Sequence, residues 1–200
     1  MPLIYERGVP VHESAVIVEY LEERWHGHGA ALLPPDPLLR AAVRAFVSSL
    51  SFLPFYALLK NTDASKAEEL KAGCVAAAEG IEARFSAPFA PAHPGASLSR
   101  LSLENGPFFL GRDLSAADVA VLPFFDRLVP GLKAHRGFDL FASSKTPRII
   151  AALDAARSRP AWAATSQSAD VYIAAYEGYA QGKPGVPMRV RRPPVAATTV

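Results

Sequence analysis

Apolar residues recur at helical spacing along most of the chain, and the first twelve residues are the main exception. Residues 3–5 and 9–12 are short extended runs on either side of a Gly-containing turn, which predicts a β-hairpin. Over residues 13–25 the apolar positions fall three and four apart with acidic residues opposite them, which predicts an amphipathic helix. Residues 26–35 are rich in Gly and Pro and predict a linker.

Two long helices are predicted after this linker. Asp36 is a good N-cap and Pro37 suits the first helical position, so we expect a helix over residues 36–60. It should bend near Pro54, because proline removes one backbone hydrogen bond. A second helix over about residues 63–85 would complete a helical hairpin.

The second half of the chain continues the helical pattern. Residues 86–106 are rich in Pro, Ala and Ser and predict a loop. The helix that starts at residue 115 is apolar nearly all round, so we place it in the core and end it before a connection at 131–145. Further helices are expected over residues 146–158 and 168–179. From residue 182 onward the chain is Pro-rich, basic and without periodicity, which is typical of a disordered tail.

Composition narrows the classes of function. The net charge of the 200 residues is only +2, which disfavours nucleic acid as a partner. Cys74 is the single cysteine, so an internal disulfide and a zinc cluster are excluded and no metal is expected. A reducing cytoplasmic location is the simplest expectation. The start of the chain is not typical of a signal peptide, and no segment approaches the length of a charge-free membrane span.

Four groups of residues, taken in order, resemble the glutathione S-transferase superfamily, nearest to its omega-like and plant-type branches. They are residues 2–5 with the Gly turn after them, Glu13-Ser14 at a helix start, the linker 32–37, and the stretch 109–118 that ends in Ser115 and Asp118. The resemblance implies a mainly α fold, the helical bundle of the transferase C-terminal domain behind a remnant β-hairpin and helix of a thioredoxin-like domain. The implied domains are 1–27 for the remnant, 36–181 for the bundle and 182–200 for the tail.

The same resemblance implies what this chain would do. The family adds the glutathione thiolate to an electrophile or exchanges it with a disulfide, using a Tyr, Ser or Cys near the first helix of the thioredoxin-like half. Because Pro2 matches the cis-proline that follows that region, we expect the chain to be truncated before it. No residue here is therefore assigned as catalytic, and the chain is expected to be inactive by itself.

Glu13 and Ser14 are the best candidates for binding glutathione. The free N–H groups and the dipole at a helix N-terminus favour an anion, so Ser14 could hold the γ-glutamyl carboxylate. Glu13 could accept the ligand's ammonium group. The alternative is that one of the two side chains only caps the helix, which is worth about 1 kcal/mol.

Met1 and Pro2 are further candidates that rest on the resemblance. In the family the residue before the cis-proline pairs its backbone with the cysteinyl part of glutathione, as an added strand would. Here that residue is Met1, whose amide is replaced by a charged terminal amine. The alternative is a trans proline at a frayed terminus.

Ser115 and Asp118 are expected to form a capping box, which guides folding and does no chemistry. Cys74 is interpreted as a small apolar core residue, with a redox-sensitive thiol as the alternative. Aromatic residues and one arginine on the first long helix match the helix that lines the electrophile pocket in the family, but such a stripe is also typical of plain core. These residues are Arg44, Phe46, Phe52, Phe55 and Tyr56.

Two functions from different classes remain open. The first is glutathione conjugation or thiol exchange, with glutathione and small electrophiles or thiols as ligands. The second is a non-catalytic ligand-binding or protein-interaction module of the transferase fold. A homodimer is a further expectation, whereas membrane and nucleic-acid partners are not expected.

Overall fold

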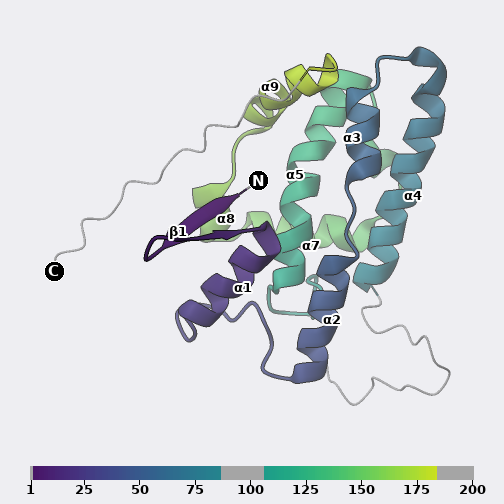
Figure 1. Cartoon of the computed structure of the whole chain (residues 1–200). Helices are drawn as coiled ribbons and strands as arrows, with labels where there is room; N and C mark the ends of the chain where they lie inside the picture. The colour runs from purple at the N-terminus through teal and green to yellow at the C-terminus, as the bar shows by residue number, and fades with distance from the viewer. Residues whose placement is uncertain (1, 87–105, 184–200) are drawn as a thin grey trace.

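The computed structural model describes residues 2–86 and 106–183, which form a helical bundle with one small sheet (Figure 1). The elements are, in chain order, β1 (Leu3–Glu6), β2 (Val9–His12), α1 (Ser14–Arg24), α2 (Pro37–Ser48), α3 (Leu53–Lys60), the 3₁₀ turn η1 (Ala64–Lys66), α4 (Ala67–Ser86), α5 (Ala116–Arg136), α6 (Leu140–Ser143), α7 (Pro147–Arg157), α8 (Pro160–Thr165) and α9 (Ala169–Ala180). The mainly α fold class is thereby confirmed. Most of the expected loop at 86–106 and nearly all of the expected tail lie outside the described residues.

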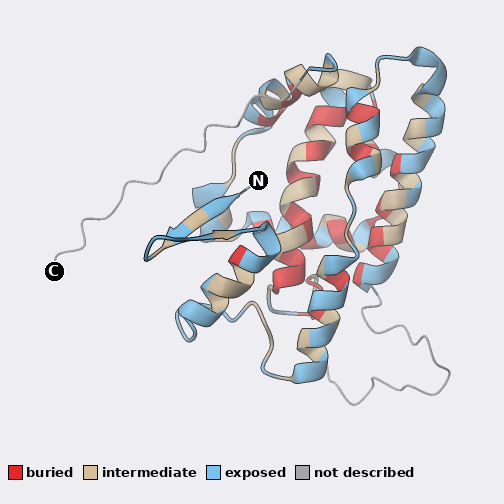
Figure 2. Ribbon diagram, viewed as in Figure 1, coloured by how far each residue is buried: buried red, intermediate tan, exposed pale blue. Residues whose placement is uncertain are grey.

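β1 and β2 form an antiparallel pair in which Ile4 lies opposite Val11. The turn between them has positive φ at both Arg7 (49°) and Gly8 (81°), as a two-residue hairpin turn requires. Both strands contact α1, but Tyr5 is 69% exposed, and Figure 2 shows a hairpin that is mostly solvent-accessible. Because a two-stranded sheet is marginally stable alone, α1 is what holds the hairpin in place.

Residues 36–60 form two helices instead of one bent helix. α2 ends at Ser48, and α3 begins at Leu53 with Pro54 in its first turn, where a missing N–H costs nothing. The hydroxyls of Ser48 and Ser49 donate to the carbonyls of Ala45 and Phe46 at 2.9 and 2.7 Å. Such local bonds compete with helix continuation, which explains a break before the proline.

The stretch Pro37–Lys60 is the one segment among residues 2–86 and 106–183 that is long and apolar enough to cross a membrane by length and composition. It is interrupted between α2 and α3. Its buried side chains, which include Val43, Phe46 and Phe55, belong to the hydrophobic core of the bundle. A core position therefore accounts for part of its hydropathy, since 28% of its most apolar window is buried.

α5 is the central helix of the bundle and contacts α2, α3, α7 and α9 (Figure 1). It continues to Arg136, beyond the end expected before Gly131, although it contains Pro123 and Pro130. Packing against four helices offsets the hydrogen bonds that the prolines remove. Gly131 permits close packing with α9, because a Cβ atom there would lie 2.8 Å from the Tyr176 ring.

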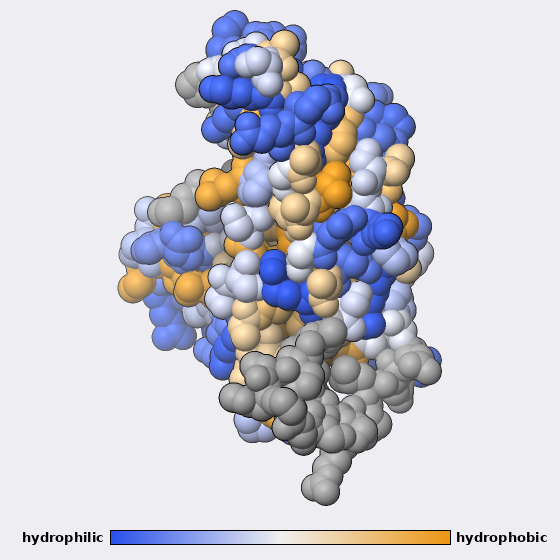
Figure 3. All heavy atoms as spheres, turned by 90° about the vertical axis from the view of Figure 1, so that its right-hand side faces the viewer, coloured by the Kyte–Doolittle hydropathy of each residue, from blue (hydrophilic) through white to orange (hydrophobic). Residues whose placement is uncertain are grey.

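The large buried side chains gather around α5, α3 and α4, where Figure 2 shows the buried residues. Among the largest are Phe55, Phe85, Phe109 and Phe125. Hydrophilic and hydrophobic residues are interspersed on the outer side of the bundle where α4 lies (Figure 3). The core therefore belongs to the helical bundle, and the hairpin contributes little to it.

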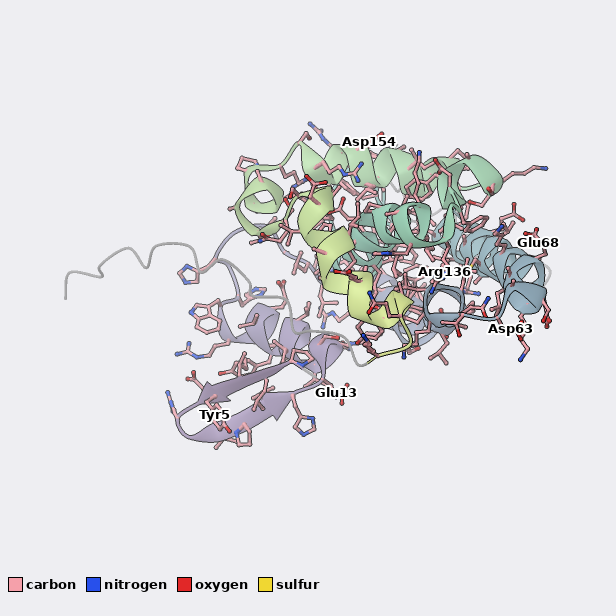
Figure 4. The ribbon with its side chains drawn as sticks, turned by 90° about the horizontal axis from the view of Figure 1, so that it is seen from above. Tyr5, Glu13, Asp63, Glu68, Arg136 and Asp154 are labelled. Atoms are coloured by element: carbon pink, nitrogen blue, oxygen red, sulfur yellow. The ribbon has the colours of Figure 1, made fainter. Side chains whose placement is uncertain are left out.

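α9 is tied to the bundle by Arg136 at the end of α5. The Arg136 guanidinium donates from Nε to the Leu58 carbonyl at 3.1 Å and from Nη2 to the Leu59 carbonyl at 2.6 Å. Nη2 also donates to the Ala180 carbonyl at 2.6 Å. One side chain thus joins the C-terminal ends of α3, α5 and α9, as Figure 4 shows from above.

Candidate functional site

The start of α1 is strained and uncapped. Glu13, its N-cap residue, has φ 70° and ψ 119°, which non-glycine residues seldom adopt and which costs about 1–3 kcal/mol. The Glu13 side chain makes no capping hydrogen bond, and the first turn carries no acidic residue. The first amides of α1 therefore keep their capacity to bind an anion. The structure does not support the alternative that Glu13 caps the helix with its side chain.

A cavity of about 300 Å³ lies beside this helix start, between α1, α2 and α5. Ser14 and Ala15 line its α1 side, and Ala116 lies at the start of α5 on the opposite wall. The remaining lining residues are mostly apolar: Val18, Glu19, Leu33, Val43, Arg44, Val47, Leu50, Phe52, Val119, Ala120 and Phe124. The cavity thus places the helix start next to an apolar chamber.

The charged part of the lining is an ion pair between α1 and α2. Arg44 donates from Nε and Nη2 to the two carboxylate oxygens of Glu19, at 3.0 and 2.8 Å. The hydrogen bond to Glu19 raises the pKa of Arg44 above its usual value. The pair is solvent-exposed, so it orients α1 on α2 and adds little stability. Arg44 is thereby neutralised and is not free to hold an anion.

The far end of the cavity is aromatic. Phe52, the N-cap residue of α3, stacks on Phe124 of α5, with ring centroids 3.9 Å apart and ring planes 8° from parallel. The stacked pair gives this end an apolar lining suited to an aromatic or aliphatic ligand body. The arrangement can therefore accept an anionic group at the α1 end and an apolar body at the Phe52–Phe124 end.

The structure separates the residues of the predicted aromatic stripe. Arg44 and Phe52 line the cavity, whereas Phe46 and Phe55 are buried in the core. The Tyr56 hydroxyl lies 3.3 Å from that of Tyr176, outside the cavity lining. Pro2 is exposed, and Met1 lies outside the described residues together with the peptide bond that joins them.

Ser115 and Asp118 form a capping box at the start of α5. The Asp118 carboxylate accepts from the Ser115 amide at 2.8 Å and from the Ser115 hydroxyl at 2.7 Å. It also accepts from the Phe109 amide at 2.9 Å, which fixes the chain before the helix. Burial raises the pKa of the Asp118 carboxyl, and these hydrogen bonds act against the rise. The pair holds the α5 wall of the cavity in position but does not face a ligand.

Cys74 packs in the hydrophobic core of the bundle. Its side chain is fully buried in α4, and its thiol lies 3.4 Å from the Pro54 carbonyl of α3. Burial raises the pKa of the thiol to about 12, so it is protonated at neutral pH. Among residues 2–86 and 106–183, no group of three His, Cys, Asp or Glu side chains is arranged to hold a metal ion.

Arg127 and Tyr176 lie next to this site and were not predicted from the sequence. The Arg127 guanidinium lies over the Phe124 ring, with Cζ 4.1 Å from the ring centroid. Tyr176 comes from α9, far along the chain from Tyr56. The spacing of Phe124 and Arg127 on one helix was a usable signal. No sequence pattern indicates that Phe124 or Arg127 of α5 lies near α9.

Comparison with known proteins matches the helical part of the chain to a family. Residues 73–165 match the family model described as "Glutathione S-transferase, C-terminal domain". Glutathione S-transferase U19 of Arabidopsis thaliana is 28% identical over 151 residues, which are 76% of this chain and 60% of that protein. Glutathione S-transferase U17 of the same plant is 31% identical over 121 residues, which are 60% of this chain and 48% of that protein. The chain thus spans about half to three fifths of the length of these relatives.

Solved structures show the same fold. The Tau class glutathione S-transferase of mango, Mangifera indica, superposes with a TM-score of 0.66 at 18% identity, over 87% of this chain and 73% of that one. Glutathione transferase Omega 3C from Trametes versicolor superposes with a TM-score of 0.63 at 24% identity, over 88% of this chain and 68% of that one. The family match, the plant relatives and the shared bundle together support membership of the glutathione S-transferase superfamily.

Proposed function

We propose that this chain binds glutathione at the start of α1 and a second, largely apolar ligand in the adjacent cavity, in support of the glutathione chemistry of its family. The observation that carries the proposal is that Ser14, at an uncapped helix N-terminus, lines the same cavity as the apolar walls of α2 and α5. A thiol-bearing ligand held at Ser14 would therefore lie beside a second molecule in the cavity.

Each residue at the helix start has a proposed role. The Ser14 hydroxyl and the free amides of the first turn would donate to the γ-glutamyl carboxylate, which the helix dipole also favours. The Glu13 carboxylate is exposed beside the hairpin and would accept from the ligand's ammonium group (Figure 4). The unusual backbone of Glu13 supports this role, because strained residues concentrate at ligand sites.

Turnover requires one more group than these residues supply. The glutathione thiol has an ordinary pKa of about 8.5, and a hydroxyl or amide donor must lower it. Ser14 is the one hydroxyl-bearing residue of the described cavity lining, and it is assigned to the γ-glutamyl end. We therefore propose that this chain binds glutathione without conjugating it, because the described cavity lining offers no further hydroxyl to activate the thiol.

Calorimetric titration with glutathione tests the binding site. Ser14→Ala and Glu13→Gln should each weaken glutathione binding about tenfold, the effect of one charge-assisted hydrogen bond. Ser48→Ala is the matched control, because the Ser48 hydroxyl bonds only to its own helix at the Ala45 carbonyl. Glutathione that lacks the γ-glutamyl amine should bind equally to the native chain and to Glu13→Gln. Binding unaffected by both variants would overturn the assignment.

A conjugation assay separates the two classes of function. With glutathione and an aryl halide, we expect no rate above background from this chain. Robust turnover would contradict the proposed lack of an activating group. If apolar ligands bind but glutathione does not, the alternative of a non-catalytic ligand-binding module is favoured. We further propose a cytoplasmic location. We also propose that a second copy of the chain is a partner, and sedimentation would test this dimer.

A further inference from the structure

A second cavity lies on a different side of α5 from the one beside α1. It measures about 650 Å³, and its lining residues come from α5, α6, α7, α8, α9 and the short connections between them. The two cavities share no lining residue. Phe124 of the first and Asp126 of the second are two positions apart, which is about 200° around a helix. The second cavity is therefore a separate site.

Asp126 places a buried carboxylate on the wall of this second cavity. The residue is only 7% exposed. Its Oδ1 atom accepts from Arg157 twice, from Nε at 3.0 Å and from Nη2 at 2.7 Å. Its Oδ2 atom makes no hydrogen bond with any residue of 2–86 or 106–183, because Arg157 contacts one oxygen instead of both. A carboxylate oxygen shielded from water in this way favours an incoming N–H donor.

Negative charge exceeds positive charge in the ion pairs around the second cavity. Arg157 is shared between two acids, because its Nη1 atom also donates to Asp154 at 3.3 Å. At the rim, Lys133 donates to Asp139 at 2.7 Å. This bond lowers the pKa of the Asp139 carboxyl, which therefore stays ionised. The carboxylates of Asp126, Asp139 and Asp154 thus share two cations, and a third cation would balance them.

The other walls of the second cavity suit a cation that carries an apolar body. Phe141, Trp162 and Tyr172 contribute three aromatic side chains to the lining. Aromatic ring faces attract organic cations, and the rings also remove apolar ligand surface from water. Val129 and Pro130 add aliphatic surface on the α5 side. The cavity therefore combines one open carboxylate oxygen with an aromatic enclosure.

From these observations we propose that the second cavity binds an organic ammonium ion with an aryl or alkyl body. The ammonium group donates to Oδ2 of Asp126, and the apolar body packs against Trp162 and Tyr172. The site goes beyond the proposed function, because it uses no residue of the cavity beside α1 and requires no glutathione.

Trp162 provides a fluorescent reporter inside the second cavity. The sequence contains two tryptophans, Trp25 and Trp162. Trp25 lies at the end of α1, is 45% exposed and is not part of this lining, so Trp25→Phe leaves Trp162 as the single tryptophan. Titrations in this background follow the Trp162 emission. Glutathione is left out, so failure of glutathione binding does not affect the result.

Three probes of nearly the same shape test the charge requirement at neutral pH and fixed ionic strength. 4-Phenylbutylamine carries an ammonium group, 4-phenylbutanol is neutral and 4-phenylbutyrate is an anion. The amine should bind at least about tenfold more tightly than the alcohol, as a charge-assisted hydrogen bond implies. The anion should bind more weakly than the alcohol, because the open oxygen of Asp126 repels it.

Variants assign the charge preference to one carboxylate. Asp126→Asn should lower the amine affinity about tenfold and leave the alcohol affinity unchanged. Asp154→Asn is the matched control, because Asp154 pairs with the same arginine but lies outside the lining, with a side chain 66% exposed (Figure 4). Lys133→Gln, at a position 66% exposed, should tighten amine binding about two- to threefold, because Asp139 loses its partner.

A thermal melt shows which variants are folded. A preference for the amine that is lost in Asp126→Asn and kept in Asp154→Asn supports the proposal. Equal affinity for amine and alcohol, or no binding of the amine, would overturn it, as would an equal fall for both probes in folded Asp126→Asn. If Asp126→Asn does not fold, Lys133→Gln decides: tighter amine binding supports the site, and unchanged or weaker binding overturns it.

Discussion

The carboxylate of Glu82 accepts a hydrogen bond from the backbone amide of Ile149, at 2.9 Å, across 67 residues of chain. It also accepts from the Arg148 amide at 2.9 Å and from the Ser86 hydroxyl at 3.1 Å. The first turn of α7 is therefore capped by a side chain of α4. Thr146, the N-cap residue of α7, makes no capping bond with its side chain, and its hydroxyl lies 3.2 Å from that of Ser144.

Glu82→Ala should lower the free energy of unfolding by about 2–3 kcal/mol, because two amides of a buried helix start lose a charged acceptor. Glu79→Ala is the control: Glu79 accepts from the Lys145 amide at 3.0 Å at an exposed position, and its loss should cost less than about 1 kcal/mol. Urea unfolding measures both variants. Equal losses would show that burial at Glu82 does not matter.

Asp118→Ala should destabilise the helical domain by about 3 kcal/mol or more, because it leaves the buried amides of Ser115 and Phe109 without their acceptor. Asp113→Ala, at an exposed position five residues earlier, should change stability by less than about 0.5 kcal/mol. Thermal melts compare the two. A native-like melt for Asp118→Ala would mean that the capping box contributes nothing to the fold.

The Cys74 thiol should resist a thiol reagent at pH 8 in the native chain and react fully in denaturant, because burial raises its pKa to about 12. The folded state then keeps a proton that the unfolded state releases above its ordinary thiol pKa of 9.0. Stability should accordingly fall as pH rises from about 9 toward 12, and Cys74→Ala should lack this part of the fall. Fast labelling of the native chain at pH 8 would contradict the buried position.

Local patterns in the sequence were enough to predict the hairpin and the starts of several helices. The hairpin turn, the start of α2 at Asp36 and Pro37, and the Ser115–Asp118 pair all involve residues within a few positions of one another. Hydrogen bonds of this kind depend on residue type and spacing, so they can be predicted from the sequence alone. The resemblance to the transferase family drew on the same local motifs.

Other features were decided by packing. The continuation of α5 through Pro123 and Pro130 depends on the helices around it, because isolated proline-containing helices lose hydrogen bonds that only burial offsets. The break between α2 and α3 likewise reflects competition between local hydroxyl bonds and the core, which spacing alone does not resolve.

The sequence by itself determined that the chain is a helical bundle behind a hairpin, with Glu13 and Ser14 at a helix start. Only the tertiary structure placed Ser14 on a cavity shared with α2 and α5, and brought Tyr56 to Tyr176 across 120 residues. The physical reason is that helix formation follows from residue spacing along the chain. A ligand site instead requires side chains from separate elements to converge, and hydrophobic packing of the whole bundle sets that convergence.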